Sequence, residues 1–242
     1  MPRINHKLKF NFPKLAYILI MMKFRFSFLF VLISTFTFAQ LPKGFVYVED
    51  IIPDIKIELR YITTNNFVGK PIEGYKATKL ILTLSATQAL KKVHAELESY
   101  GFCLKVYDAY RPQRAVNHFM RWAKDLSDTI NKKQYYPNVN KKDLFKEEYI
   151  ATRSGHSRGS TLDITIIYKT TNKDVDMGSA YDFFGEQSWV NYEGISEQQK
   201  TNRLLLQTIM KKHGFRNYSK EWWHFTLKEE PFPDTYFNFV VE

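Results

Sequence analysis

After Gln40 the sequence runs to its end without any of the interruptions that usually separate domains. Residues 40–242 contain no internal repeat, no low-complexity tract and no linker rich in Pro, Gly or Ser. Cys103 is the only cysteine, so an internal disulfide is impossible, and we interpret it as a buried structural thiol. A chain of about 200 residues buries roughly two-thirds of its unfolded surface. We therefore predict one domain, residues 40–242, stabilised by its hydrophobic core.

Residues 1–39 have the composition of a targeting segment. Lys23 and Arg25 precede an apolar run, Phe26 to Phe38, and small residues lead up to Ala39. A basic stretch, a short apolar run and a small-residue cleavage pattern are typical of a secretory signal peptide. We therefore predict cleavage after Ala39.

Cleavage there would export the domain, and we expect it in the periplasm, with membrane contact only through the signal segment. Met21 and Met22 are alternative starts, because the first 20 residues add a second basic and apolar stretch that a signal does not need. An uncleaved anchor is the other interpretation, and the shortness of the apolar run disfavours it.

The formal charge of +10 does not indicate a nucleic-acid partner. Residues 1–39 contain six basic residues and no acidic ones, so the other 203 residues carry an excess of only four positive charges. No run of Lys or Arg in this part exceeds two residues. DNA-binding surfaces need clustered basic residues. We expect no nucleic-acid binding.

Capping residues and apolar spacing predict three helices. The pattern Ser85-Ala86-Thr87-Gln88 is typical of a capping box, and Ser196 to Gln199 repeats it. A third helix should begin after Arg111-Pro112. We expect strands at 55–61, 102–109, 161–168 and 223–228. Because helices and strands mix without regular βαβ alternation, we predict an α+β fold with a central, mainly antiparallel sheet flanked by helices.

Two of the six histidines lie in segments that suggest a site. His156 belongs to a loop rich in Ser and Gly, which leads into a strand where Asp163 stands between apolar neighbours. An ionised carboxylate in such surroundings needs a metal, a donor or a cation. Asp163 is therefore either a metal ligand together with His156 or a cap for backbone N–H groups of the loop. His94, His118 and His213 lie in predicted helices without an obvious acidic face, and we interpret them as structural or solvated.

The segment Glu221-Trp222-Trp223-His224 places a carboxylate and an imidazole three residues apart. In a regular strand their side chains would point to opposite faces, so both reach one site only if Glu221 lies at a bend before the strand. His156, Asp163 and His224 together would suit Zn²⁺ at the sheet, with one position open for water. Glu221 would be a nearby base.

Arg111 lies where a predicted strand ends and a predicted helix begins. A fixed guanidinium in such a place can hold a carboxylate or stabilise an oxyanion. An ion pair with Asp108 is the alternative.

With these residues in place, the sequence resembles the zinc D-alanyl-D-alanine dipeptidases of the vancomycin-resistance type, within the wider D-Ala-D-Ala metallopeptidases. The S-x-H-x-x-G-x-x-x-D pattern from Ser154 to Asp163 and the E-W-W-H pattern from Glu221 to His224 are intact and in order. Further matching stretches are spread over the chain, at 66–71, 107–112 and 177–183. Gly155 departs from the pattern of this family, because a close relative can carry Ser at the same position.

The resemblance implies hydrolysis of the D-Ala-D-Ala dipeptide to D-alanine in cell-wall peptide turnover. Its implied zinc ligands are His156, Asp163 and His224, with one ion per chain. It makes Glu221 the general base and acid and Arg111 the group that stabilises the transition state. For substrate binding it implies Tyr61 and Asp182 at the free amino group, together with Ser154.

Two other classes share parts of this pattern. A D,D-carboxypeptidase acting on peptidoglycan stem peptides would use the same zinc site with an open cleft on the acyl side. A non-catalytic zinc or cell-wall binding module would use Trp189, Trp222 and Trp223 as aromatic platforms. Glu221 argues against the second class, since a binder needs no base beside its metal.

Overall fold

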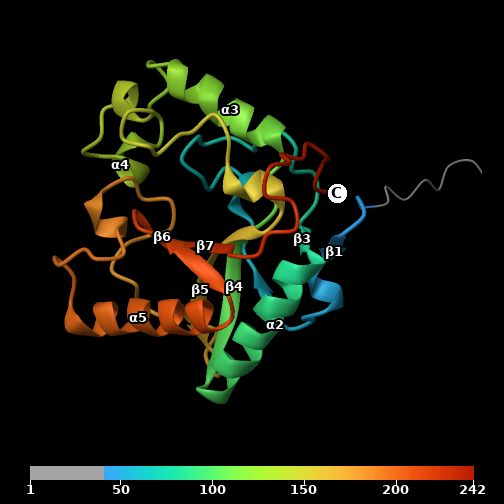
Figure 1. Cartoon of the computed structure of the whole chain (residues 1–242). Helices are drawn as coiled ribbons and strands as arrows, with labels where there is room; N and C mark the ends of the chain where they lie inside the picture. The colour runs from blue at the N-terminus through green and yellow to red at the C-terminus, as the bar shows by residue number, and fades with distance from the viewer. Residues whose placement is uncertain (1–40) are drawn as a thin grey trace, which may run out of the picture. The chain divides into compact units, whose positions relative to one another are not determined.

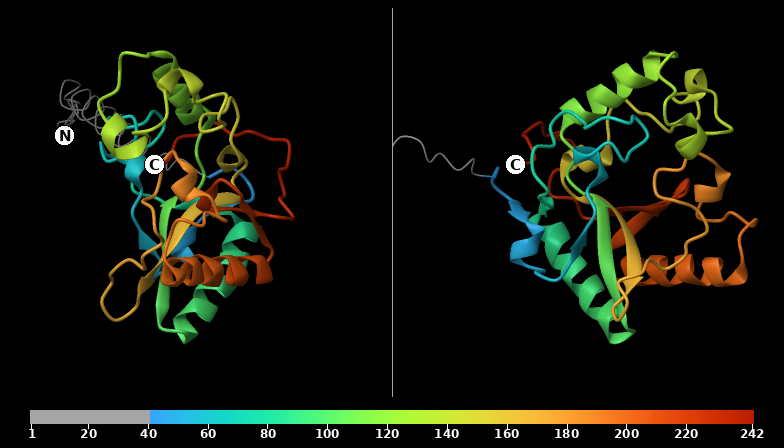
Figure 2. Two further views of the ribbon diagram at one scale, coloured as in Figure 1. Left: turned by 90° about the vertical axis from the view of Figure 1, so that its left-hand side faces the viewer. Right: turned by 180° about the vertical axis from the view of Figure 1, so that it is seen from behind.

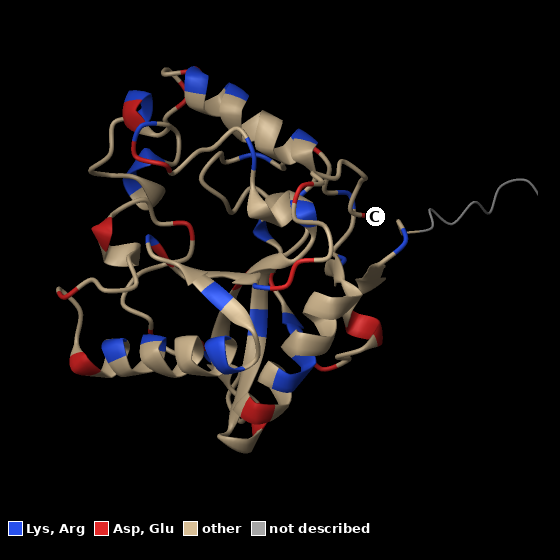
Figure 3. Ribbon diagram, viewed as in Figure 1, with Lys and Arg blue, Asp and Glu red and all other residues tan. Residues whose placement is uncertain are grey.

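The computed structural model describes residues 41–242, which form one compact unit. The predicted signal peptide and its cleavage point lie outside these residues. None of the described helices combines the length and the apolar character that crossing a membrane would need. Figure 3 shows Lys and Arg residues spread over several helices and loops, with Asp and Glu residues at other places along the chain.

A five-stranded sheet forms the centre of the domain (Figure 1). The strands lie in the order β2-β4-β5-β7-β6, in which only β2 and β4 are parallel, so the predicted mainly antiparallel sheet is confirmed. Antiparallel β1 and β3 form a separate ribbon. The strands are β1 (Phe45–Tyr47), β2 (Lys56–Ile57), β3 (Ile81–Thr83), β4 (Phe102–Asp108), β5 (Thr161–Tyr168), β6 (Phe215–Tyr218) and β7 (Glu221–Leu227).

Helices α2 (Leu84–Ser99) and α5 (Glu197–Lys212) cover one face of this sheet (Figure 2). Alternate residues of β5, namely Leu162, Ile164 and Ile166, are fully buried against them in the main core. Because neighbouring side chains of a strand point to opposite faces, Asp163 and Thr165 face away from these helices. Because the apolar residues of β5 are buried against the helices, the Asp163 carboxylate lies on the other side of the sheet.

A second, aromatic core lies under α3 (Gln113–Lys124). Phe67, Phe119 and Trp122 are buried there with ring centroids about 5 Å apart, at the tilted angles that aromatic pairs favour. The remaining helical elements are short: α4 (Lys132–Tyr135), η1 (Val48–Asp50), η2 (Arg60–Ile62), η3 (Lys141–Asp143), η4 (Gly155–Arg158) and η5 (Glu186–Ser188).

The capping predictions succeed for one helix and fail for another. Ser196 caps α5, and its reciprocal bonds with Gln199 complete the capping box. The prediction for Ser85 is wrong, because α2 begins at Leu84 and its N-cap is Thr83, whose side chain accepts from the Ala86 N–H. The last residue of β3 thus caps the helix directly, without an intervening loop.

Two strand predictions also need correction. The first predicted strand shortens to Lys56–Ile57, because the chain turns into η2 right after Glu58 donates its N–H to Val106. The last strand begins earlier than predicted, at Glu221, because Tyr218 and Glu221 pair across a tight turn.

Thr83→Ala should therefore destabilise the protein, whereas Ser85→Ala should not. The Thr83 hydroxyl caps α2 and lies 2.8 Å from the Ser160 hydroxyl, so its loss should lower the free energy of unfolding by about 1–2 kcal/mol. Ser85 is exposed, and its replacement should change that free energy by less than about 0.5 kcal/mol. Urea denaturation measures both, and equal losses would contradict the observed cap.

Candidate active site

Three neighbouring strands bring acidic and imidazole side chains into one row. In the sheet register, Asp163 of β5 lies opposite Asp108 of β4 on one side and opposite His224 of β7 on the other. Directly opposed residues of antiparallel strands have neighbouring side chains on the same face. The register therefore places the Asp163 carboxylate beside the His224 imidazole.

His156 joins this row from the turn η4. The N–H of His156 donates to the Ser154 hydroxyl at the start of the turn, and Gly159, with φ +80°, ends it. A side chain at Gly159 would also collide with the Phe45 ring. The His156 ring then lies with its Nδ1 2.8 Å from the Ala109 carbonyl oxygen. This bond fixes Nδ1 as the donor and leaves Nε2 with a free lone pair.

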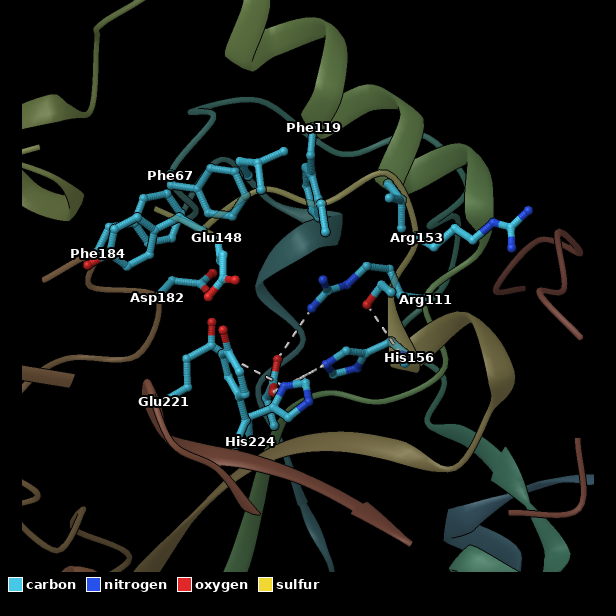
Figure 4. Close-up of a pocket in the computed structure, with 18 of the residues that line it drawn as sticks. Phe67, Arg111, Phe119, Glu148, Arg153, His156, Asp182, Phe184, Glu221 and His224 are labelled. Atoms are coloured by element: carbon cyan, nitrogen blue, oxygen red, sulfur yellow. Dashed lines mark hydrogen bonds and ion pairs between the residues drawn. The ribbon is translucent and has the colours of Figure 1, made fainter. Parts of the chain in front are cut away.

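Three potential ligand atoms converge at this point (Figure 4). His156 Nε2 lies 3.3 Å from Asp163 Oδ1 and 3.3 Å from His224 Nδ1, and His224 Nδ1 lies 3.1 Å from Asp163 Oδ1. Atoms at these separations all fit at about 2.1 Å from a single point, as in tetrahedral zinc sites. Asp163 Oδ1 is buried and has no hydrogen-bond donor. Because buried carboxylate oxygens are normally satisfied, this arrangement fits a metal cation.

The charges of the group agree with a cation site. Burial by itself would raise the pKa of Asp163, but the His156 and His224 imidazoles hold it well below its usual range. Burial by itself would lower the pKa of His224, but the neighbouring carboxylates of Asp163 and Glu221 raise that pKa to about 9. Without a metal, a proton on His224 thus supplies the positive charge.

Glu221 reaches the same site from the start of β7. Its Oε2 lies 3.3 Å from His224 Nδ1. Glu221 is the first residue of the strand itself and does not lie at the bend before it that the pattern had suggested. The register is irregular between Asn217 and Tyr218 of the paired strand. This irregularity at the hairpin accompanies the orientation of both Glu221 and His224 toward the pocket (Figure 4).

Arg111 is partly buried and makes two ion pairs. Its Nε lies 2.8 Å from Asp108 Oδ2, and its Nη2 lies 3.3 Å from Asp163 Oδ2. The ion pair with Asp108 that the sequence analysis gave as an alternative is therefore present. It does not exclude a further role, because Arg111 also borders the pocket.

Asp182 lies on the opposite wall and is 6% exposed. Tyr61 donates its hydroxyl hydrogen to Asp182 Oδ2 over 2.9 Å. Burial and the nearby charge of Asp163 raise the pKa of Asp182 well above its usual range. Asp182 also has φ +61°, a backbone conformation that is unusual for a residue with a side chain. A buried carboxylate with a raised pKa is stabilised by a cation placed beside it.

These groups border one pocket of about 400 Å³, within the range of small-molecule sites. All eight predicted site residues line it: Tyr61, Arg111, Ser154, His156, Asp163, Asp182, Glu221 and His224. The Ser154 hydroxyl already caps η4. Apolar side chains form much of the remaining wall, namely Phe67, Val116, Phe119, Tyr149, Ile150 and Phe184.

Sequence reasoning missed one residue that supports the site. Tyr181 donates its hydroxyl hydrogen to Asp163 Oδ2 over 3.1 Å, and its ring stacks on Tyr107. The available signal was its place beside Asp182 in a stretch that matches the resembled family.

The expectation that His94 has no acidic neighbours is wrong. His94 Nε2 lies 3.2 Å from Asp54 Oδ2, and Glu98, one helical turn later, completes a second group with the residue types of a metal site. Glu98 is already paired with Lys169 at 2.6 Å.

Two of the three tryptophans that a binding module would use as aromatic platforms are unsuited to that role. Trp222 and Trp223 are 3% and 2% exposed and belong to the main core, so neither can stack on a ligand at the surface.

Comparison with known proteins agrees with this site. The model of the family described as "Peptidase_M15: D-ala-D-ala dipeptidase" matches residues 42–242. A D-alanyl-D-alanine dipeptidase of Enterococcus faecalis is 40% identical over 198 residues, which cover 82% of this chain and 98% of that protein. One of Streptomyces coelicolor is 40% identical over 197 residues, covering 81% and 98%. One of Escherichia coli is 35% identical over 179 residues, covering 74% and 82%.

The fold and the convergent donor set define a zinc metallopeptidase. Within that class, the chain belongs to the D-Ala-D-Ala dipeptidase family.

Zinc affinity should depend strongly on pH, because Zn²⁺ must displace the proton of His224. With the pKa of His224 raised to about 9, the apparent affinity should rise about tenfold per pH unit from pH 6 to pH 8 and level off above about pH 9. Competition with a chromophoric chelator measures this slope. The control variant His118→Ala should show the same dependence of zinc affinity on pH as the wild type. His224→Ala should bind zinc far more weakly. An affinity that does not change with pH would contradict the assignment.

Proposed function

We infer that this protein hydrolyses the dipeptide D-Ala-D-Ala to D-alanine with the help of a zinc ion. One observation carries this inference: the acceptor atoms of His156, Asp163 and His224 converge on one point beside Glu221, in a pocket that also holds a buried carboxylate, Asp182. The dipeptidases to which the chain is similar match it over nearly their whole length.

His156, Asp163 and His224 would hold the zinc ion, one per chain. When bound, zinc supplies Lewis acidity, which polarises the scissile carbonyl and acidifies a water molecule. The Ala109 carbonyl keeps the His156 ring oriented, and Tyr181 and Arg111 both bond to Asp163 Oδ2. These contacts leave Oδ1 of Asp163 for the metal.

Glu221 is the general base and acid of the reaction. Its carboxylate is half-buried and borders the pocket, so it can take a proton from the attacking water and later donate it to the leaving amine.

Arg111 stabilises the negative charge that develops on the carbonyl oxygen. Its ion pairs with Asp108 and Asp163 fix the guanidinium before the reaction, so little reorganisation is needed at the transition state. Its contribution should therefore appear in turnover more than in ground-state binding.

Asp182 and Tyr61 recognise the free amino group of the dipeptide. The ammonium group would supply the cation that the buried Asp182 lacks, and Tyr61 holds the carboxylate from the other side. Ser154 would contact the carboxylate end of the substrate.

A D,D-carboxypeptidase that acts on peptidoglycan stem peptides is the alternative. Such an enzyme must accommodate an acylated amino group and the peptide beyond it. Asp182 and the aromatic wall stand against it, because an acylated substrate would bring no charge to a buried carboxylate.

The physiological setting that we infer is cell-wall peptide turnover outside the cytoplasm. The support comes from the signal-like sequence of residues 1–39, with its basic residues, apolar run and small residues before Gln40. N-terminal sequencing of the exported protein tests this, and a mature chain that retains the apolar run would indicate a membrane anchor.

Glu221→Gln should retain zinc and the fold but lose nearly all activity. Removing a general acid–base group typically costs about 10²–10⁴-fold in kcat. Glu229→Gln is a matched control, because Glu229 follows the same strand and is exposed. Steady-state kinetics and zinc content measure the effect. Wild-type kcat in Glu221→Gln would falsify the assigned role.

Free D-Ala-D-Ala should be cleaved at least about 100-fold faster, in kcat/KM, than its N-acetyl form. Acetylation removes the ammonium charge and leaves Asp182 buried without its partner, which costs several kcal/mol. Asp182→Asn should reduce this preference. A carboxypeptidase should show the reverse order, so the same kinetic comparison separates the two functions.

A further inference from the structure

Arg203 of α5 is one of the most deeply buried charged residues of the domain. It is 2% exposed, and no carboxylate of residues 41–242 lies within ion-pair distance of it. Burial lowers the pKa of Arg203 to about 10, which still leaves the guanidinium charged at neutral pH. Burying a charge without a counter-charge is costly, so the partners that compensate it are informative.

Within residues 41–242, all the hydrogen-bond partners of the Arg203 guanidinium are backbone carbonyls, and the guanidinium also lies over the Trp222 ring, 5.9 Å from its centroid. Nε donates to the Met177 carbonyl over 2.6 Å, Nη1 to that of Trp189 over 2.7 Å, and Nη2 to that of Gln187 over 2.7 Å. The planar guanidinium fixes the directions of all three bonds, which a lysine could not do. Arg203 thus ties the two ends of the segment 177–189 to one point on α5.

This segment carries Asp182 near its middle, and its only regular element is the short turn η5. Asp182 adopts φ +61°, and such a backbone conformation persists only where the surroundings impose it. Within the segment, the Ser188 hydroxyl donates to the Phe183 carbonyl over 2.6 Å, and Trp222 donates to the Ser179 hydroxyl over 2.9 Å.

We propose that Arg203 is a positioning residue that sets the preference of the enzyme for a free amino group, because it holds the segment that presents Asp182. This rests on the proposed function, in which Asp182 binds the substrate ammonium. Arg203 touches neither substrate nor metal. It acts through the position of the Asp182 carboxylate.

The three metal ligands lie outside the segment 177–189, although Tyr181 of that segment donates to Asp163 Oδ2. Asp163 and His224 pair directly within the sheet, and His156 is fixed by the Ala109 carbonyl. Loss of Arg203 should therefore weaken amino-group recognition more than zinc binding. General destabilisation would instead affect free and acetylated substrates alike.

The test is a double-mutant cycle between Arg203→Met and Asp182→Asn in the zinc-loaded enzyme. Arg203→Met should lower kcat/KM for free D-Ala-D-Ala about 10- to 100-fold, mainly through KM, and change that for the N-acetyl form less than about threefold. In the Asp182→Asn background the same substitution should change kcat/KM for the free dipeptide less than about threefold. Arg203→Lys keeps the positive charge but loses the planar set of N–H donors. Its kcat/KM for the free dipeptide should lie between those of the wild type and Arg203→Met.

Arg121→Met is the control, because this exposed arginine pairs with Glu73 on the outer side of α3 and should behave as wild type. If Arg203→Met does not fold, as judged by circular dichroism and zinc content, Arg203→Lys takes its place in the cycle.

Equal effects on both substrates, or a full effect in the Asp182→Asn background, would overturn the proposal. Failure of the proposed function would show separately, as an Asp182→Asn single variant that keeps the wild-type preference for the free amino group.

Discussion

The arrangement of the site depends on a buried carboxylate, Asp163, one oxygen of which has no hydrogen-bond donor. One of its oxygens, Oδ2, accepts from Tyr181 and Arg111, while the other faces two imidazole nitrogens and has no donor. The sheet register and the Ala109 carbonyl fix those imidazoles, so the free oxygen and the two nitrogens stay together. A cation at this point relieves the cost of burying the carboxylate, which couples metal binding to the stability of the site.

The same reasoning extends over the whole pocket. Glu148, Asp163, Asp182 and Glu221 line the pocket, and the Arg111 guanidinium pairs with Asp163 and with Asp108, which does not itself line the pocket. A zinc dication beside Asp163 and a substrate ammonium beside Asp182 would each place a positive charge next to a buried carboxylate. The two ends of the pocket therefore have different tasks. In the proposed function, the metal end performs the chemistry and the Asp182 end selects a substrate with a free amino group.

The sequence predicted the site better than it predicted the details of the fold. His156, Asp163 and His224 could be identified because imidazole and carboxylate groups in apolar or glycine-rich surroundings need a compensating partner, whatever the fold. The N-cap at Ser85 failed because a competing hydroxyl, Thr83, stands two residues earlier at the end of β3. Arg203 could not be recognised at all, because its partners are backbone carbonyls, which every residue carries. Contacts with the backbone leave no pattern in side-chain types.

X-ray absorption spectroscopy of the zinc-loaded protein tests the central claim most directly, because it reports the ligands of the metal itself. The structure predicts two imidazoles and oxygen ligands at about 2.0–2.2 Å, with one imidazole lost in His156→Ala. A sulfur ligand at about 2.3 Å, or an imidazole count that His156→Ala does not change, would contradict the convergence of His156, Asp163 and His224 on one zinc ion.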